Sequence, residues 1–326
     1  MVEKNIKPLC PPEVAPRYED IPYAEVILDN GDKYTLKMDI YQNSQQVEIG
    51  PTIVYIFGGG FLWGEYKQRT QKAVYCRDLV RLTEKGYTIV CPDYRLASQS
   101  PMPACIYDLK CLIRFLKAMG SEYLIDAERI GVLGNSAGGH LASFLALTGD
   151  NPVVEGDVGG YREFSSKIKA AVSFYGTSDL CGMLEESAIS KQAEKELDGT
   201  EIEGLGNHLA DKIPAIIVGY KGEGRSVKKL FEILEKEDSS HPDWSYVSIL
   251  KQASPINYVH SGAAPLLLLH GGQDQIVPIS QSIKLFDALL KVGADVTLIQ
   301  TSKGGHGPSL GKTIDFVGYQ FLIDRL

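Results

Sequence analysis

The chain has 326 residues, of which 44% are hydrophobic and 23% are charged, so it is long enough to bury a sizeable core and too apolar for a disordered protein. Its formal net charge is −8 and it has no basic run, which argues against nucleic acid or an anionic membrane as a partner. Its 33 glycines are above the usual frequency, and clustered glycines mark backbone that approaches another group closely.

The N-terminus and the cysteines bear on the cellular compartment. Residues 1–8 lack the apolar segment of a signal peptide, and no apolar run approaches the ~18–20 residues of a membrane helix. None of the six cysteines forms a CxxC pair, so we expect scattered reduced thiols at Cys10, Cys76, Cys91, Cys105, Cys111 and Cys181. The expected location is cytoplasmic, and a processed secreted form stays open.

The chain opens with a proline-rich stretch, residues 1–20, which predicts an irregular arm on the surface. Residues 24–28 and 34–40 predict two strands joined by a hairpin turn at residues 29–32. Further strands are predicted at residues 52–57, 87–91, 130–133, 169–174, 265–269 and 295–300, and helices at residues 71–85, 107–118, 139–147, 281–291 and 314–326.

This alternation of strands and helices indicates βαβ units and a mostly parallel sheet with helices on both faces. The opening hairpin predicts an antiparallel edge on that sheet. Residues 182–252 interrupt the alternation with charges, glycines and short helical pieces, and they contain one strand-like run at residues 213–218. We interpret residues 182–252 as a cap inserted into a single domain that spans residues 1–326.

The strongest chemical signal is the sequence GNSAG at residues 134–138, which contains Ser136. A predicted strand leads into it and a predicted helix leads out. The flanking glycines permit a tight turn, which would present the serine hydroxyl at the carboxyl edge of the sheet. The alternative is a glycine-rich turn whose serine only caps the helix, and the context favours a nucleophile.

A serine nucleophile needs a base that a third group holds in place. Among six histidines, His306 stands out because glycines flank it in a loop just after the last strand. His140 is expected to pack inside its helix, and His270 to support the loop that follows it. Asp274 is the favoured acid because it follows a strand and precedes the histidine unit, in the chain order Ser, Asp, His. Asp179 is the rival acid, although a helix-capping role suits it better.

Three consecutive glycines, residues 58–60, follow the predicted strand at residues 52–57. Glycine lets such a loop aim its N–H groups inward, toward the negative charge that forms when an ester carbonyl is attacked. The donors would be the N–H groups of Gly59, Gly60 and Ala137. No GK[ST] sequence follows the loop, so a phosphate-binding loop is not indicated.

Five stretches together resemble the α/β-hydrolase superfamily: YIFGGGF at residues 55–61, PDYRL at 92–96, GNSAGGH at 134–140, HGGQD at 270–274 and GHG at 305–307. Within it, the chain is most similar to the hormone-sensitive-lipase-like esterases of the bacterial feruloyl and acetyl-xylan esterase type. The resemblance covers residues 20–180 and 253–326. It implies the α/β-hydrolase fold, and a cofactor-free, metal-free carboxylic ester hydrolase.

The resemblance also implies a role for each residue. Ser136 is the nucleophile, His306 the general base and then acid, and Asp274 orients His306, while Gly59, Gly60 and Ala137 form the oxyanion hole. Two departures stand out: the family's usual histidine before the glycine loop is Phe57 here, and residues 182–252 form a long insertion.

The expected substrates are short acyl or hydroxycinnamoyl esters of plant-wall sugars, so the expected partner is a small-molecule or oligosaccharide ester, and a homodimer stays open. The candidate substrate-binding residues are Trp63, Asn135 and Trp244. The two tryptophans offer stacking surface; anchoring the insertion is the alternative, equally favoured for Trp244. A peptidase, a formamidase or an acyltransferase with the same triad is the alternative enzyme, and a non-catalytic binding protein the alternative class.

Overall fold

An eight-stranded sheet lies at the centre of the computed structural model, which describes residues 15–64, 79–190, 193–197, 210–307, 310 and 312–326. Its strands lie in the order β1-β2-β4-β3-β5-β6-β9-β10. The bounds are β1 Tyr18–Ile27, β2 Lys33–Tyr41, β3 Gly50–Ile56, β4 Thr88–Pro92, β5 Ile125–Asn135, β6 Ala170–Phe174, β9 Leu266–Gly271 and β10 Val296–Thr301. Strands β4, β3, β5, β6, β9 and β10 pair in parallel in that order, and β1 and β2 form the predicted antiparallel edge.

The first strand is longer than predicted. It begins at Tyr18, within the stretch predicted to be an irregular arm, while residues 1–14 lie outside the described part of the chain. The register with β2 shifts between Pro22 and Ala24. A proline is tolerated on such an edge strand because one side of the strand has no sheet partner to which an N–H must donate. Composition suggested irregular backbone here, but pairing with β2 decided the conformation.

Helices cover both faces of the sheet, as the alternation predicted. They are α3 (Ala104–Met119), α4 (Ala137–Thr148), α9 (Ser280–Lys291) and α10 (Lys312–Ile323). Alternate residues of β6 identify opposite faces, because neighbouring side chains on a strand point in opposite directions. The glycines of the two helices show which face each helix covers. A Cβ placed on Gly139 of α4 would meet the Ser173 hydroxyl, whereas a Cβ placed on Gly318 of α10 would meet the Val172 and Phe174 side chains.

The helix predicted at residues 71–85 falls largely outside the described residues. Its described end is a short 3-10 helix, Arg81–Lys85. Gly86 then ends the helix in the left-handed conformation, with φ +82°, and its N–H bonds to the Thr83 carbonyl oxygen. The prediction that Gly86 closes this segment is confirmed.

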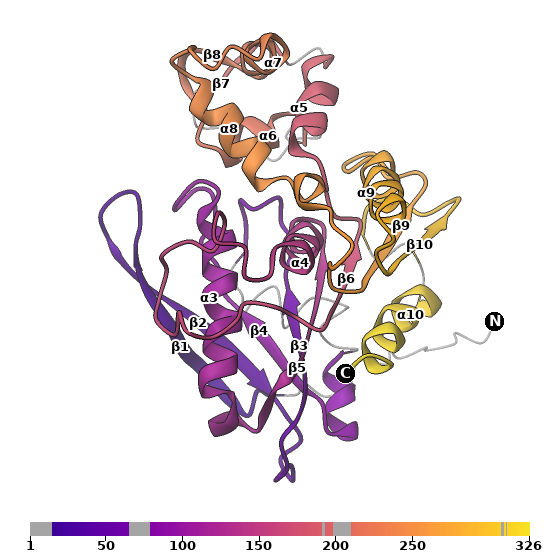
Figure 1. Ribbon diagram of the computed structural model, residues 1–326. Coiled ribbons are helices and arrows are strands. Elements are labelled where there is room, and N and C mark those ends of the chain that lie inside the picture. The colour runs from indigo at the N-terminus through magenta and orange to yellow at the C-terminus, as the bar shows by residue number, and fades with distance from the viewer. Residues whose placement is uncertain (1–14, 65–78, 191–192, 198–209, 308–309, 311) are drawn as a thin grey trace, which may run out of the picture.

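A separate group of elements follows β6 and lies above the sheet in Figure 1. It contains α5 (Leu180–Ala188), α6 (Ile213–Ile217), α7 (Val227–Lys236), α8 (Trp244–Ala253) and a small antiparallel pair, β7 (Glu196–Leu197) and β8 (Gly222–Ser226). The strand-like reading of residues 213–218 is wrong, because that segment is α6. Pro214 lies in the first helical turn, where its missing N–H costs nothing, and Ala215 and Ile217 are buried.

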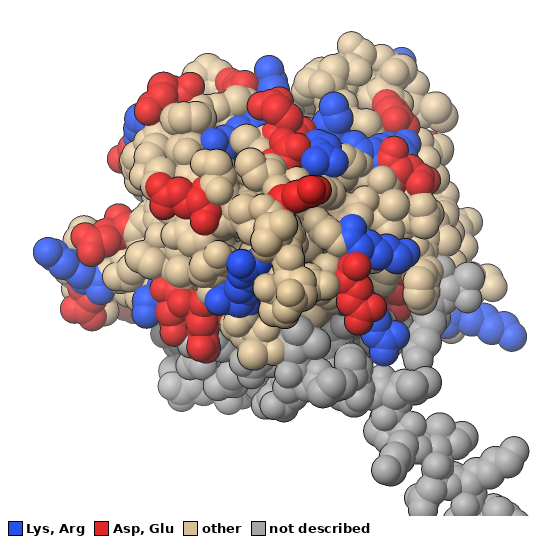
Figure 2. All heavy atoms as spheres, turned by 90° about the horizontal axis from the view of Figure 1, so that it is seen from below, with Lys and Arg blue, Asp and Glu red and all other residues tan. Residues whose placement is uncertain are grey.

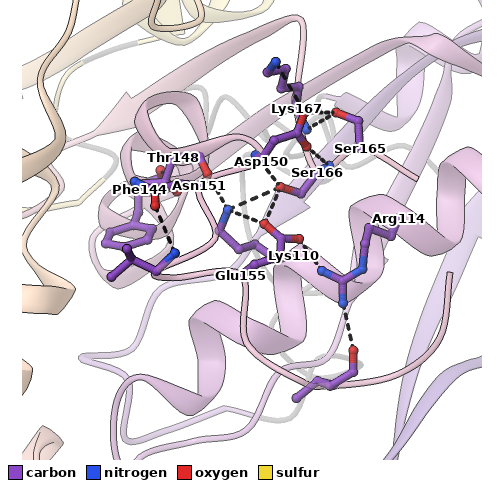
Figure 3. A network of polar contacts seen from close by, with 12 residues as sticks. Lys110, Arg114, Phe144, Thr148, Asp150, Asn151, Glu155, Ser165, Ser166 and Lys167 are labelled. Carbon is purple, nitrogen blue, oxygen red and sulfur yellow. Dashed lines mark hydrogen bonds and ion pairs between the residues drawn. The ribbon is translucent and has the colours of Figure 1, made fainter. Parts of the chain in front are cut away.

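A buried ionic network joins α3 to the segment after α4 (Figure 3). The side chains of Lys110 and Arg114 are 0% and 1% exposed, and both bond to the carboxylate of Glu155. The Lys110 ammonium also donates to the Thr148 carbonyl oxygen at 2.5 Å, and the Ser166 hydroxyl donates to Glu155 at 2.8 Å. Two buried cations therefore share one carboxylate.

The surface charge is mixed. On the coloured part of the face seen from below, acidic and basic side chains are interspersed (Figure 2). Of the cysteines that the structure describes, Cys105, Cys111 and Cys181 are free thiols. Over the same part of the chain, no helix is both long and apolar enough to cross a bilayer.

Candidate active site

Ser136 lies on a strained turn between β5 and α4. Its φ of +55° and ψ of −121° are unusual for a residue with a Cβ. The turn is tight: a Cβ on Gly134 would lie 2.1 Å from the Gly138 carbonyl oxygen, so only glycine fits. The Ser136 N–H donates to the Phe174 carbonyl oxygen at 2.8 Å, which fixes the turn against β6. The hydroxyl is thereby held at the carboxyl edge of the sheet, at the start of α4.

The structure brings Ser136, His306 and Asp274 together although they are far apart in sequence. The Nε2 atom of His306 lies 3.0 Å from the Ser136 Oγ atom, and its Nδ1 atom lies 2.7 Å from the Asp274 carboxylate. A carboxylate only accepts hydrogen bonds, so Nδ1 carries the proton and Nε2 is the acceptor for the serine hydroxyl. This is the geometry of a hydroxyl activated by an oriented imidazole.

Asp274 is a buried anion with several donors. Its Oδ1 atom accepts the N–H groups of Ile276 and Val277, each at 2.9 Å, and its Oδ2 atom accepts His306 and lies 3.3 Å from His270 Nε2. Burial raises the pKa of Asp274, but hydrogen bonds from His270 and His306 and from the backbone outweigh it and hold the pKa well below its usual range. The carboxylate therefore stays charged beside the imidazole.

His270 and His140 have the supporting roles that their positions predicted. His270 is fully buried, and its ring nitrogens contact the Ser282 hydroxyl at 2.7 Å and the Val277 carbonyl oxygen at 2.8 Å, which ties down the Asp274 loop. His140 is buried in α4 and donates from Nδ1 to the Thr177 carbonyl oxygen. Burial lowers the pKa of His140 to about 4, so its ring is neutral at pH 7.

Asp179 caps a helix. Its side chain accepts the Gly182 N–H at 2.9 Å at the start of α5, and it lies 3.4 Å from the Lys284 ammonium. The described carboxylate that bonds to His306 is that of Asp274. The predicted helix-capping role of Asp179 is confirmed.

The glycine loop follows β3 directly and lies against the serine turn. A Cβ on Gly58 would meet the Asn135 carbonyl oxygen at 2.5 Å and the Ser136 Cβ at 3.1 Å. Gly59 and Gly60 have φ values of +125° and +60°, which favour glycine. Among the described residues, their N–H groups donate to no backbone acceptor.

Phe57, at the position of the family's usual histidine, is held by an aromatic neighbour. Its ring stacks on Tyr94 with centroids 4.4 Å apart and an interplanar angle of 18°. The Tyr94 hydroxyl also donates to the Phe57 carbonyl oxygen at 2.9 Å. Stacking and one hydrogen bond therefore support the base of the glycine loop.

The candidate substrate-binding residues lie in different surroundings. Asn135 accepts the Tyr55 hydroxyl at 2.9 Å and lies beside Gly58, while the Trp63 ring lies beside Gly60. Trp244, in α8, packs with the Lys251 ammonium 5.0 Å from its ring centroid.

Sequence reasoning gave no role to Tyr175. Its ring contacts the imidazole of His306, with centroids 4.6 Å apart. The available signal was its place directly after β6, because residues that follow parallel strands gather at one edge of the sheet.

Comparison with known proteins places the chain in a family. The BD-FAE family model matches residues 38–217 and 240–289, which is more than half of the chain. This chain belongs to the BD-FAE family. The match leaves out residues 218–239, which contain β8 and α7, so the family resemblance is interrupted within the segment above the sheet.

The chain is also similar to longer proteins of known name. It is 26% identical over 242 residues to the probable carboxylic ester hydrolase LipM of Mycobacterium tuberculosis, covering 74% of this chain and 45% of LipM. It is 24% identical over 277 residues to the isoprenylcysteine alpha-carbonyl methylesterase ICME of Arabidopsis thaliana, covering 85% of this chain and 55% of ICME. This BD-FAE chain thus spans about half the length of these relatives.

Solved structures share the fold over nearly the whole chain. A truncated carbohydrate esterase from gut microbiota superposes with a TM-score of 0.72 at 24% identity, covering 97% of this chain and 98% of that one. Esterase 2 of Thermogutta terrifontis, phosphonylated by sarin, superposes with a TM-score of 0.64 at 22% identity, covering 96% of each chain. Together with the strand order, these likenesses show that this BD-FAE protein has the α/β-hydrolase fold.

Proposed function

We propose that this protein is a serine carboxylic ester hydrolase that works through an acyl-enzyme on Ser136. The observation that carries the proposal is the unbroken hydrogen-bonded path from the Ser136 hydroxyl through His306 to Asp274, with lengths of 3.0 and 2.7 Å. A serine hydroxyl at its ordinary basicity is a weak nucleophile, and such a path is what activates it.

In the first half-reaction, the Ser136 Oγ atom attacks the ester carbonyl carbon and its proton passes to His306 Nε2. The resulting oxyanion accepts hydrogen bonds from the N–H groups of Gly59, Gly60 and Ala137. His306 then gives the proton to the departing alcohol, and the acyl group stays on Ser136. Asp274 keeps the imidazole in the required tautomer and balances its charge while it is protonated.

In the second half-reaction, water replaces the alcohol. His306 takes a proton from this water, which attacks the acyl carbonyl carbon, and the same N–H groups receive the new oxyanion. Collapse of this intermediate returns the proton to Ser136 and releases the carboxylic acid.

The proposed substrates are short acyl or hydroxycinnamoyl esters, such as acetyl and feruloyl esters of plant-wall carbohydrates. The names of the structural neighbours support this choice: besides the carbohydrate esterase, the chain matches a bifunctional GH43-CE protein of Bacteroides eggerthii at 25% identity and a TM-score of 0.69. Trp63 is half-buried, and its ring lies beside Gly60, so it supplies an aromatic surface next to the glycine loop.

Active-site labelling tests the nucleophile. A fluorophosphonate probe should add one mass equivalent to the peptide that contains Ser136, and Ser136→Ala should lose the label and up to ~10⁶-fold in kcat. Ser143→Ala is the matched control, because Ser143 is a buried serine of α4 outside the hydrogen-bonded path. Labelling at another serine, or full activity in Ser136→Ala, would refute the proposal.

A substrate panel tests the ester class. We expect hydrolysis of acetyl, butyryl and feruloyl esters and no comparable cleavage of peptides or formamides. A preference for the peptide or formamide substrates would instead identify the protein as a peptidase or a formamidase that uses the same triad.

A further inference from the structure

The residue that follows β6 has an unusual backbone conformation. Tyr175 has φ +41°, in the left-handed region that residues with a Cβ rarely adopt, yet its N–H still pairs with the Leu269 carbonyl oxygen at 2.7 Å. Gly176 packs tightly on α4, since a Cβ there would lie 2.5 Å from the Gly139 carbonyl carbon. The chain is therefore pinned on both sides of Tyr175, and surrounding contacts of this kind maintain a strained conformation.

This conformation places the Tyr175 ring against His306. The two ring centroids are 4.6 Å apart with an interplanar angle of 59°, and Tyr175 is 2% exposed. A cation placed over an aromatic ring, within about 6 Å of its centroid, is attracted by the ring, more strongly where water is excluded. The two rings are close enough for this attraction to act on the imidazole once it has taken a proton.

We infer that Tyr175 is a positioning residue whose aromatic ring stabilises the imidazolium form of His306 and holds the imidazole toward Ser136. The inference rests on the proposed function, in which that cation forms as His306 takes the serine proton. Tyr175 contacts the ring of His306, whereas Asp274 and Ser136 hydrogen-bond to the two nitrogen atoms of that ring.

The other groups that face His306 can be separated from Tyr175. Among the described residues they are the Asp274 carboxylate from the segment after β9 and the Ser136 hydroxyl from the turn after β5. His270 lies behind Asp274 and contacts its carboxylate. Replacing the Tyr175 side chain does not change Asp274 or Ser136, so the two hydrogen-bond partners of His306 are kept in the variants.

The test compares Tyr175→Phe, Tyr175→Leu and Tyr175→Met. All three keep a Cβ at the strained position, so backbone strain does not distinguish them, and only Phe keeps an aromatic ring. Losing the ring destabilises the imidazolium, so protonation of His306 requires a lower pH. For Leu and Met we expect the half-maximal pH on the acid side of the kcat/KM profile to fall by about 0.5–1 unit.

The maximal kcat should also fall about 5–30-fold in Tyr175→Leu and Tyr175→Met, with a smaller change in KM, because the imidazolium is most developed in the transition state. Tyr175→Phe should restore both the half-maximal pH and most of kcat. Phe115→Leu is the matched control: it removes a buried ring of α3 that packs edge-on against Tyr161, so it should lower stability without moving the pH profile.

A second readout does not depend on turnover. The titration midpoint of the His306 imidazole, followed by NMR and assigned with His306→Gln, should move down in the same two variants. An unmoved midpoint in folded Tyr175→Leu and Tyr175→Met would overturn the inference, as would an equal shift in Tyr175→Phe, which would assign the effect to the hydroxyl. If instead Ser136 is not labelled and no ester is cleaved, the proposed function fails while the titration still decides the ring contact.

Discussion

Burial and hydrogen bonding set the charge of two ionisable residues near Ser136, Asp274 and His140. Asp274 is buried, yet its several donors keep it ionised, so it is a fixed negative charge behind His306. His140, one helical turn after Ser136, is buried among aromatic rings and stays neutral. The surroundings of Ser136 therefore contain one permanent anion, Asp274, and one neutral imidazole, His140, which supports the fold.

The acid can be identified by a pair of variants. Asp274→Asn should keep the fold but lower kcat by roughly 10⁴-fold, because the imidazole loses the partner that fixes its tautomer. Asp179→Asn should stay close to wild type, because Asn caps helices about as well as Asp. Steady-state kinetics with an acetyl ester would measure both, and the reverse outcome would make Asp179 the acid.

The neutral state of His140 predicts how stability depends on pH. The pKa of His140 is about 4 in the folded chain and about 6.5 in an unfolded one, so folding favours the neutral ring. The resulting stabilisation is complete above pH ~6.5 and is lost as the pH falls toward 4, by about 2–3 kcal/mol at pH 4.5. Urea unfolding of the wild type at pH 7 and pH 4.5 should show this loss.

His140→Gln provides the comparison, because a Gln amide can still donate to the Thr177 carbonyl oxygen and does not titrate. The free energy of unfolding of this variant should fall less between the two pH values. An equal fall in both proteins would mean that other groups, such as the carboxylates, carry the whole pH dependence.

At the scale of elements, close backbone approach positions α4. A Cβ on Gly138 would lie 2.0 Å from the Ile56 carbonyl oxygen at the end of β3, and one on Gly139 would lie 2.8 Å from the Phe174 carbonyl oxygen at the end of β6. The start of α4 therefore rests directly on two strand ends. This contact holds Ser136 beside the glycine loop, which itself follows β3.

The buried ionic network ties α3 to the segment after α4. Burial lowers the pKa of Lys110, and the neighbouring Glu155 carboxylate opposes that shift. Because Glu155 also pairs with Arg114, its single negative charge offsets part of the charge of two buried cations (Figure 3).

Glu155→Gln should destabilise the protein by about 2–4 kcal/mol, because it leaves two buried cations without a carboxylate. Urea unfolding at pH 7 would measure the loss. Glu163→Gln is the matched control, an exposed carboxylate of the same segment, and should change stability by less than about 0.5 kcal/mol. A Glu155→Gln variant as stable as wild type would show that water or another group compensates the two cations.

At the scale of the whole molecule, the elements from α5 to α8 reach the site through α6. A Cβ on Gly60 would meet the Ile213 δ-methyl group at 3.2 Å, and the Met102 N–H donates to the Ile217 carbonyl oxygen at 2.8 Å. Both ends of this group lie beside the strand edge that carries Ser136 (Figure 1). We propose that residues 182–252 form a cap that selects the acyl group.

Removing that cap should change the selectivity between acyl groups more than it changes the rate of acetyl ester hydrolysis. A deletion of residues 182–252, closed with a flexible linker, should alter the feruloyl-to-acetyl ratio of kcat/KM more than it alters acetyl hydrolysis. Ile213→Ala is the milder version and should shift the ratio in the same direction, because it removes the apolar contact above Gly60. A folded deletion variant with an unchanged ratio would exclude the cap as the selectivity element.

The sequence by itself determined the alternation of strands and helices along the chain and the position of Ser136 between a strand and a helix. Apolar runs that alternate with helical periodicity, and glycines on both sides of a serine, are local patterns, so they can be read without knowing which segments meet. The same local chemistry predicted Gly86 as a helix end and the helix-capping role of Asp179.

Only the tertiary structure decided features that depend on distant partners. Ile213, Ile216 and Ile217 are β-branched but lie in α6, because packing of this helix against α5 and α7 outweighs local propensity. Asp274 and Asp179 both follow strands, and only the folded chain places the former on His306. The contact between Tyr175 and His306 joins residues 131 positions apart in the chain, through a backbone conformation that no local pattern encodes.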